Sequence, residues 1–272
     1  MTLPSAPAET IHGTADGTVY SVAGSGPPVV LVHGLGMHRG MWMWQVPALA
    51  TRFTVITYDL LGHGESRNPP ENCTLSDFAG QLLALCDALG LGSVALAGFS
   101  LGGMIVRSFV LAHPDRVNAL AILHSAHDRT PEERAAIMVR VHQAAEAGPA
   151  ATVEGALERW FGEDFRAANP DVIDLVRSAV MANDPAVYPS IYRILAQGDA
   201  ELATAISAIQ CPTLVMTGSE DYGNSADMSQ RMAASIPHAQ CVILPGLRHM
   251  ALAEDPDAFN APLISFLESA TV

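Results

Sequence analysis

Short apolar runs alternate with longer stretches of helical period along the first half of this chain. Four of the runs are apolar enough to be strands buried on both faces of a sheet, at residues 29–32, 53–58, 93–97 and 117–123. Segments of helix length separate them, at residues 38–49, 75–89 and 101–113. A strand that is followed by a helix and then by another strand predicts a mostly parallel, doubly wound α/β sheet.

A different pattern begins near residue 125. As far as residue 209 it is that of successive helices, at residues 131–147, 151–161, 170–181 and 185–195. Strands and helices then alternate again, at residues 213–217, 226–235, 240–244 and 256–267. A helical insert between two halves of one sheet is typical of a cap. We therefore expect an α/β core of residues 1–124 and 210–272, and a helical cap of residues 125–209.

The composition is that of a globular protein with a large core. The chain has 272 residues, of which 49% are hydrophobic, and this excludes a disordered chain. No run is long enough to span a bilayer and no secretory signal pattern is present, so we expect a cytoplasmic location. The four cysteines lack metal-type spacing and are expected to be reduced.

Charge narrows the class of partner. The formal net charge is −14, and the 14 basic residues other than histidine are all arginine. An acidic surface argues against nucleic acid and anionic membranes as partners, which leaves a small-molecule substrate as the expectation. The sequence leaves open whether the chain forms a homo-oligomer.

One short motif carries the candidate chemistry. Gly98, Ser100 and Gly102 form a G-x-S-x-G pattern that follows an apolar strand and opens a helix. This strand–turn–helix is typical of a nucleophile elbow, in which a sharp turn raises the serine above the sheet edge. Side chains at positions 98 and 102 would collide with neighbouring backbone in such a turn. We expect Ser100 to be a nucleophile at a helix N-terminus, where developing negative charge is favoured.

A serine nucleophile needs a base that a carboxylate orients. Of the ten histidines, His249 lies between the last strand and the last helix, which brings it to the carboxyl edge of the sheet. Asp221 follows the strand at 213–217 and precedes this histidine, which is the chain order expected of the acid. Its neighbour Glu220 and Asp128, which follows an earlier strand, are the alternatives.

Two backbone N–H groups are expected to bind the oxyanion of a tetrahedral intermediate. The N–H of Leu101 is one, because this residue follows the nucleophile. Leu35 is the expected second donor, because the turn at His33-Gly34 leaves the next N–H facing the site. The side chains of His33 and His63 lie in turns and are expected to be structural hydrogen-bonding groups.

Together these motifs resemble a known superfamily over nearly the whole chain. The ordered set comprises His33-Gly34-Leu35-Gly36, Gly62-His63-Gly64-Glu65-Ser66, residues 98–104, Asp221 and Gly246-Leu247-Arg248-His249. The sequence resembles the α/β-hydrolase superfamily and is most similar to its 3-oxoadipate enol-lactonases, small carboxylesterases and non-haem haloperoxidases. The cap run Leu157-Glu158-Arg159-Trp160-Phe161 is also similar to lactonases. The resemblance implies a water-using acyl transfer with no metal or organic cofactor.

The leading hypothesis is a serine hydrolase for a small ester or lactone, in the degradation of aromatic or heterocyclic compounds. The same residues also suit an amide, an enamide or a vinylogous carbon–carbon bond. The hypothesis from another class is a ligand receptor on this fold that does not turn over its ligand.

Candidate substrate-binding residues come from the loops and the cap. Met37 and Trp160 are expected to line the pocket. The resemblance to enol-lactonases implies a carboxylate-bearing substrate, and a guanidinium suits a carboxylate because it donates two parallel hydrogen bonds. Four arginines are candidates for such an anchor: Arg39 after the oxyanion loop, and Arg129, Arg159 and Arg193 in the cap.

Overall fold

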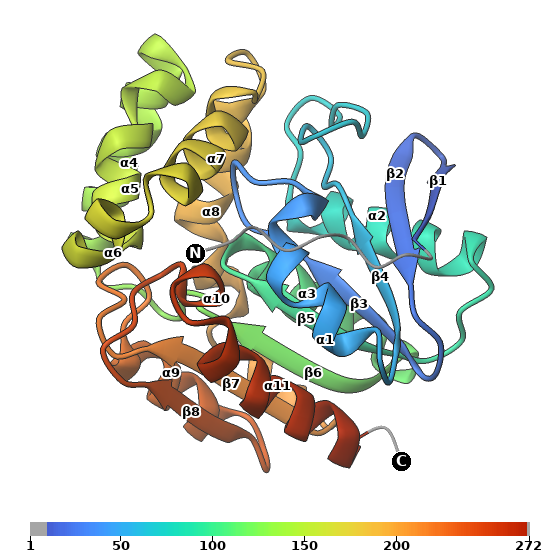
Figure 1. Ribbon diagram of the computed structural model, residues 1–272. Helices are drawn as coiled ribbons and strands as arrows, with labels where there is room; N and C mark the ends of the chain where they lie inside the picture. Colours follow the sequence, from blue (N-terminus) through green and yellow to red (C-terminus); the bar gives the residue numbers. More distant parts are fainter. Residues whose placement is uncertain (1–9, 271–272) are drawn as a thin grey trace.

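An eight-stranded sheet runs through the centre of the protein in the computed structural model, which describes residues 10–270 (Figure 1). Its strand order is β1-β2-β4-β3-β5-β6-β7-β8. β2 pairs antiparallel with β1 and β4, and all the other neighbours are parallel. The strands are β1 (Ile11–Ala15), β2 (Thr18–Ala23), β3 (Pro28–Val32), β4 (Thr54–Tyr58), β5 (Val94–Phe99), β6 (Val117–Leu123), β7 (Thr213–Gly218) and β8 (Gln240–Leu244). This confirms the mostly parallel α/β sheet.

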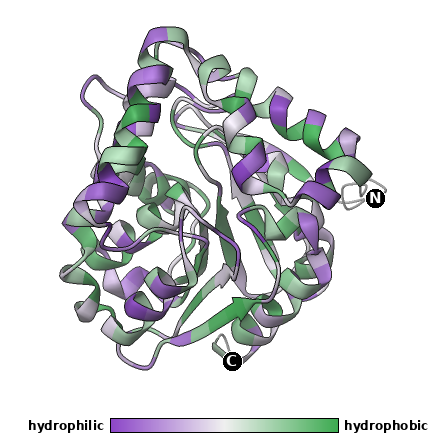
Figure 2. Cartoon of the chain, turned by 90° about the vertical axis from the view of Figure 1, so that its left-hand side faces the viewer, coloured by the Kyte–Doolittle hydropathy of each residue, from purple (hydrophilic) through white to green (hydrophobic). Residues whose placement is uncertain are grey.

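Helices cover both faces of the sheet because alternate strand residues point to opposite sides. Val30 and Ile56 face one core, which is closed by α2 (Leu75–Ala88), α3 (Leu101–Ala112) and α9 (Ala226–Ser235). Val29 and Val55 face the other core, which is closed by the 3-10 helix η1 (Arg39–Trp44), α1 (Val46–Leu49), α10 (Ala251–Glu254) and α11 (Pro256–Ala270). Figure 2 shows the strands as a hydrophobic interior within these helices.

The segment between β6 and β7 is helical, as expected. It contains α4 (Pro131–Ala147), α5 (Val153–Trp160), α6 (Glu163–Ala168), α7 (Pro170–Met181) and α8 (Tyr188–Leu202), which lie together at the upper left of Figure 1. Three further short 3-10 helices lie within residues 10–270: η2 (Pro114–Arg116), η3 (Pro149–Ala151) and η4 (Ala205–Ala208). No helix in the described part of the chain is long and apolar enough to cross a membrane.

Several expected helices differ from the structure. The segment 38–49 is not one helix but η1 followed by α1, because Pro47 at the start of α1 supplies no N–H to continue the first helix. α8 begins at Tyr188 and ends at Leu202, seven residues beyond the expected end. The helix α6 and the β1–β2 hairpin were not expected.

Candidate active site

Ser100 occupies the sharp turn between β5 and α3. Its φ of 55° and ψ of −112° are rare for a residue with a side chain, and its N–H donates a 2.9 Å hydrogen bond to the carbonyl of Leu123. A Cβ at Gly98 would lie 2.3 Å from the carbonyl oxygen of Gly102, and one at Gly102 would lie 2.1 Å from that of Val32. The turn therefore requires both glycines, which confirms the expected elbow geometry.

His249 and Asp221 are hydrogen-bonded to each other. His249 lies in the loop after β8, and its Nδ1 is 2.7 Å from Oδ2 of Asp221, which follows β7. Oδ1 of the same carboxylate accepts hydrogen bonds from the N–H groups of Gly223 and Asn224. Burial alone would raise the pKa of Asp221, but the charge of His249 and hydrogen bonds from His124 and His249 outweigh it and hold this pKa well below its usual range. Asp221 is therefore an ionised hydrogen-bond acceptor.

The alternative carboxylates lie elsewhere. The side chain of Asp128 is 61% exposed and pairs with Arg231 at 3.6 Å. Glu220 is half exposed and faces Arg248 at 3.9 Å. Within residues 10–270, Asp221 is the carboxylate that contacts the Nδ1 of His249.

The loop after β3 is fixed by two neutral histidines. Nε2 of His33 accepts the N–H of Leu60 at 2.9 Å, and Nε2 of His63 accepts the N–H of Gly36 at 3.0 Å. Burial lowers the pKa of both rings, that of His63 to about 4, so each remains an acceptor at neutral pH. This bears out their expected structural role. In the described chain the N–H groups of Leu35 and Leu101 have no carbonyl partner. Leu101 follows Ser100 directly, and Leu35 lines the same pocket as Ser100.

A pocket of about 200 Å³ contains Ser100 and His249. Core residues Gly34, Leu35, Met37 and Phe99 line one side, while residues of α4, α5 and α8 line the other. Met37, Arg159 and Trp160 thus lie where the sequence predicts them, and the Trp160 ring lies 5.8 Å from that of His249. A volume this small suits a small substrate.

Two of the four arginine candidates lie outside this pocket. The Arg39 guanidinium pairs with the buried carboxylate of Asp59 and with Glu65, and it lines a separate groove. Its own neighbours satisfy it, so the structure does not bring Arg39 to the pocket of Ser100, where an anchor is expected from the sequence. Arg193 lines a different surface groove beside α8.

The arginines that do line the pocket differ in how they are paired. Arg129 is bound to the fully buried Asp199, with Nη1 3.1 Å from Oδ1. The guanidinium of Arg159 has no hydrogen bond or ion pair among the described residues. Arg140, which the sequence reading missed, donates from Nε to the hydroxyl of Tyr192 at 3.2 Å and meets no carboxylate there. Burial lowers the pKa of Arg159, and the charge of Arg140 lowers it further. The pocket therefore holds two neighbouring guanidiniums, neither of which is paired with a carboxylate of the described chain.

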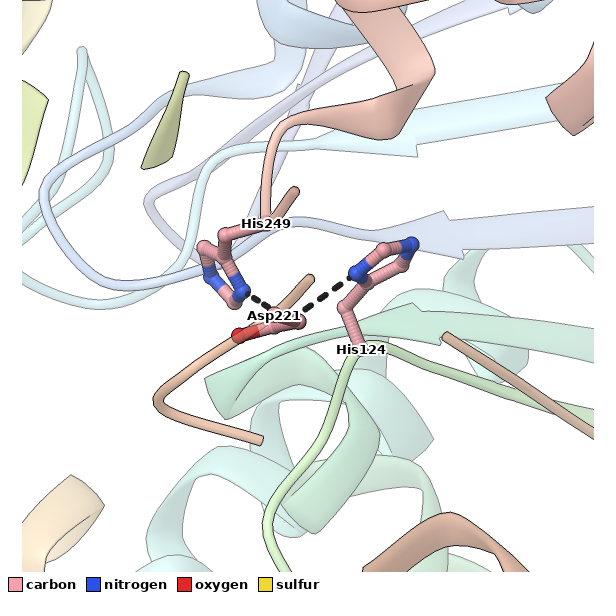
Figure 3. A group of neighbouring side chains, drawn as sticks. All are labelled: His124, Asp221 and His249. Carbon is pink, nitrogen blue, oxygen red and sulfur yellow. Dashed lines mark hydrogen bonds and ion pairs between the residues drawn. The ribbon is translucent and has the colours of Figure 1, made fainter. Parts of the chain in front are cut away.

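His124 is a second residue that sequence reasoning missed. It follows β6, and its Nδ1 lies 3.0 Å from Oδ2 of Asp221, on the opposite side from His249 (Figure 3). The three side chains each offer a potential metal ligand atom within 4.8 Å of the others. The Nδ1–Oδ2 distances of 2.7 and 3.0 Å are those of hydrogen bonds. Hydrogen bonding to Asp221 is therefore enough to explain why the three side chains lie together.

Comparisons with known proteins identify the family to which this fold belongs. Residues 27–143 match the model of a family described as alpha/beta hydrolase fold. The chain is 32% identical over 252 residues to (E)-2-((N-methylformamido)methylene)succinate hydrolase of Acinetobacter baylyi, covering 92% of this chain and 94% of that protein.

Two solved structures share the fold over nearly their full length. The enol-lactonase of Burkholderia xenovorans LB400 superposes with a TM-score of 0.86 at 28% identity, over 95% of this chain and all of that one. A thermophilic esterase of Thermogutta terrifontis, solved with malate bound, superposes with a TM-score of 0.85 at 28% identity, over 97% of this chain and all of the other.

Proposed function

Because this chain belongs to the alpha/beta hydrolase fold family and is a hydrolase, we propose that Ser100 is its nucleophile, His249 its general base and Asp221 the carboxylate that orients the base. The observation that carries this proposal is the pairing of two features in one pocket. Ser100 lies at a strained elbow, and the imidazole of His249 is bound at 2.7 Å to a buried, ionised aspartate.

The reaction follows from these positions. Oγ of Ser100 attacks the carbonyl carbon while His249 takes the hydroxyl proton, and Asp221 stabilises the imidazolium. The N–H groups of Leu35 and Leu101 bind the oxyanion. His249 gives its proton to the leaving oxygen or nitrogen, and an acyl-serine forms. A water molecule, deprotonated by His249, then attacks the acyl carbon. The bond to Oγ breaks, His249 returns the proton to Ser100, and the acid is released.

The cap completes the pocket and supports a role in substrate selection. We assign residues 125–209 to a cap whose helices α4, α5 and α8 enclose the acyl group. Closure of this kind excludes water from the reacting groups and admits only substrates of suitable shape.

Charge in the cap supports a substrate that carries a carboxylate. A half-buried guanidinium without an anion is costly, and an incoming carboxylate would offset that cost at Arg159 and its neighbour Arg140. The substrate we propose is a small ester or lactone with a carboxylate placed to reach these two side chains.

A carboxylate-bearing enamide or amide is the second candidate, because the relative from Acinetobacter baylyi is named for a formamido-methylene succinate. A panel of enol-lactones, aryl esters and enamides, each with and without a carboxylate, separates the two through kcat/KM. Preference for the oxygen-linked acids supports the first candidate, and preference for the nitrogen-linked acids supports the second. Covalent labelling by a fluorophosphonate that persists in Ser100→Ala would reject the nucleophile itself.

A further inference from the structure

The carboxylate of Asp221 serves two imidazoles rather than one. Oδ2 lies 2.7 Å from Nδ1 of His249 and 3.0 Å from Nδ1 of His124, while Oδ1 accepts two backbone N–H groups (Figure 3). Orientation of the base requires only the contact with His249. The proposed mechanism therefore leaves the contact from His124 without a role.

The His124 ring is neutral and carries its proton on Nδ1. The side chain is fully buried, and this burial lowers its pKa. An ionised carboxylate can only accept a hydrogen bond, so Nδ1 is the donor. Nε2 has no partner among the described residues. The ring stacks with Phe259 at 6.1 Å and lies 5.5 Å from that of Phe99, and both contacts hold its orientation.

The backbone at His124 is held in an unusual conformation. Its φ is 49°, in the region that residues with side chains rarely adopt. The conformation is fixed by a 2.7 Å hydrogen bond from the His124 N–H to the carbonyl of Met216 on β7, and by the side-chain bond to Asp221. Strain that persists in a buried position points to a functional constraint.

We infer that His124 is a positioning residue that holds Oδ2 of Asp221 and limits how strongly this carboxylate stabilises a protonated His249. The inference rests on the proposed roles of Asp221 and His249. A hydrogen bond donated to a carboxylate favours its charged form and makes it a weaker proton acceptor. The acidic limb of the pH–activity profile then lies at a lower pH than it would if Asp221 bound only the catalytic base. The free base is available over a wider pH range as a result.

The charged and titratable groups around the imidazole of His249 are the same in every variant of His124 compared below. Charged and titratable side chains face it from several elements: Asp221 after β7, Arg129 before α4, Glu133 and Arg140 on α4, Arg159 on α5, Tyr188 and Tyr192 on α8, Tyr222, and Arg248 and Glu254 beside His249. None of these is altered, so a difference in pH profile between the variants originates at position 124.

Two substitutions distinguish the role of the Nδ1–H donor of His124 from the role of its aromatic ring. His124→Phe keeps an aromatic ring between Phe99 and Phe259 but has no donor. His124→Asn loses the ring but places an amide N–H where Nδ1 lies, and asparagine tolerates positive φ. The measurement is the pH dependence of kcat/KM for a neutral aryl ester. The acidic limb of this profile reports protonation of the base in the free enzyme.

The limb should move to higher pH by about 0.5 unit or more in His124→Phe, a roughly threefold change in the protonation equilibrium. It should remain at the wild-type position in His124→Asn. An unchanged limb in the phenylalanine variant would overturn the inference, and so would an equal shift in both variants, because packing alone would then explain it.

A second measurement does not depend on the phenylalanine variant being folded. Imidazole N–H protons that are bound to a carboxylate give far-downfield proton resonances, and we expect two such signals in the wild type. One should persist in His249→Ala and vanish in His249→Ala/His124→Asn. Loss of both signals in His249→Ala would contradict a standing bond from His124. Retained activity in His249→Ala would instead reject the proposed function, so the two failures are distinguishable.

Discussion

The backbone N–H of Met250 donates a 3.0 Å hydrogen bond to the carbonyl of Trp160, so the residue after His249 is tied to the last residue of α5. The side chain of Arg248, on the other side of His249, donates from Nη1 to the carbonyls of Glu158 and Phe161. The loop that carries the proposed base is therefore anchored to the cap. Displacement of α5 would displace the base as well.

One carboxylate joins the same two segments. Glu254 accepts the N–H of Gly162 in the cap at 2.7 Å and the N–H of Arg248 in the histidine loop at 2.8 Å. Burial raises the pKa of Glu254 against the opposing effect of these two donors. The carboxylate thus bridges cap and core directly beside the proposed base.

Glu254→Ala should weaken both stability and turnover. Two partly buried N–H groups lose their acceptor, at a cost of about 1–3 kcal/mol in the free energy of unfolding. A loosened His249 should lower kcat by about tenfold, because small misplacements of a reacting group are costly. Urea unfolding and kcat with an aryl ester measure the two effects. The control is Glu268→Ala, which removes an exposed pair with Arg52 and should leave both quantities near wild type. An unchanged kcat in Glu254→Ala would contradict the coupling.

Ser100→Ala and His249→Ala should each lower kcat on the order of 10³-fold or more, and the double variant should lose little beyond either one. The reason is that the two side chains act as one unit in the attack on the carbonyl. Steady-state turnover of a p-nitrophenyl ester provides the measurement, with thermal unfolding to check that each variant is folded. Activity within tenfold of wild type in either single variant would be incompatible with the proposed roles.

Asp221→Asn should be severely impaired, whereas Asp128→Asn should keep most of its activity. The amide at position 221 would present a donor to His249 Nδ1 and favour the wrong tautomer. Asp128 is largely exposed and its partner is Arg231, so its loss removes only a surface pair. The comparison uses kcat/KM at a fixed pH near neutrality. The reverse ranking of the two variants would transfer the orienting role to the loop after β6.

Local chemistry explains why parts of this structure could be predicted from sequence. α4 begins and ends where expected, because Thr130 and Glu133 form a capping box around Pro131 and Gly148 follows the last turn. Ser100 was found because an elbow needs glycine at fixed positions, which leaves a readable motif. Both features depend on residues that are neighbours in the chain.

The residues that were missed or misassigned depend on tertiary contacts. Arg140 lies three residues after the buried Ile137 and four before the buried Ala144, so it shares their face of α4. This position on the helix was the only signal in the sequence that it lines the pocket. His124 directly follows a buried strand, but its partner Asp221 is 97 residues away. Arg39 is sequestered by Asp59, a carboxylate 20 residues further along the chain. Spacing does not reveal such partners, because the fold alone brings them together.

Arg159→Ala should raise KM for a carboxylate-bearing substrate at least tenfold, about 1.4 kcal/mol, and leave a small neutral aryl ester almost unchanged. A surface of net charge −14 repels an anion at long range, so recognition must come from a local cation. Arg159 lines the pocket without an anionic partner, and Arg140→Ala should act in the same direction. Arg193→Ala, whose side chain lines another groove, is the matched control. If Arg159→Ala and Arg140→Ala treat both substrates alike, the substrate is neutral and the two guanidiniums serve the packing of the cap.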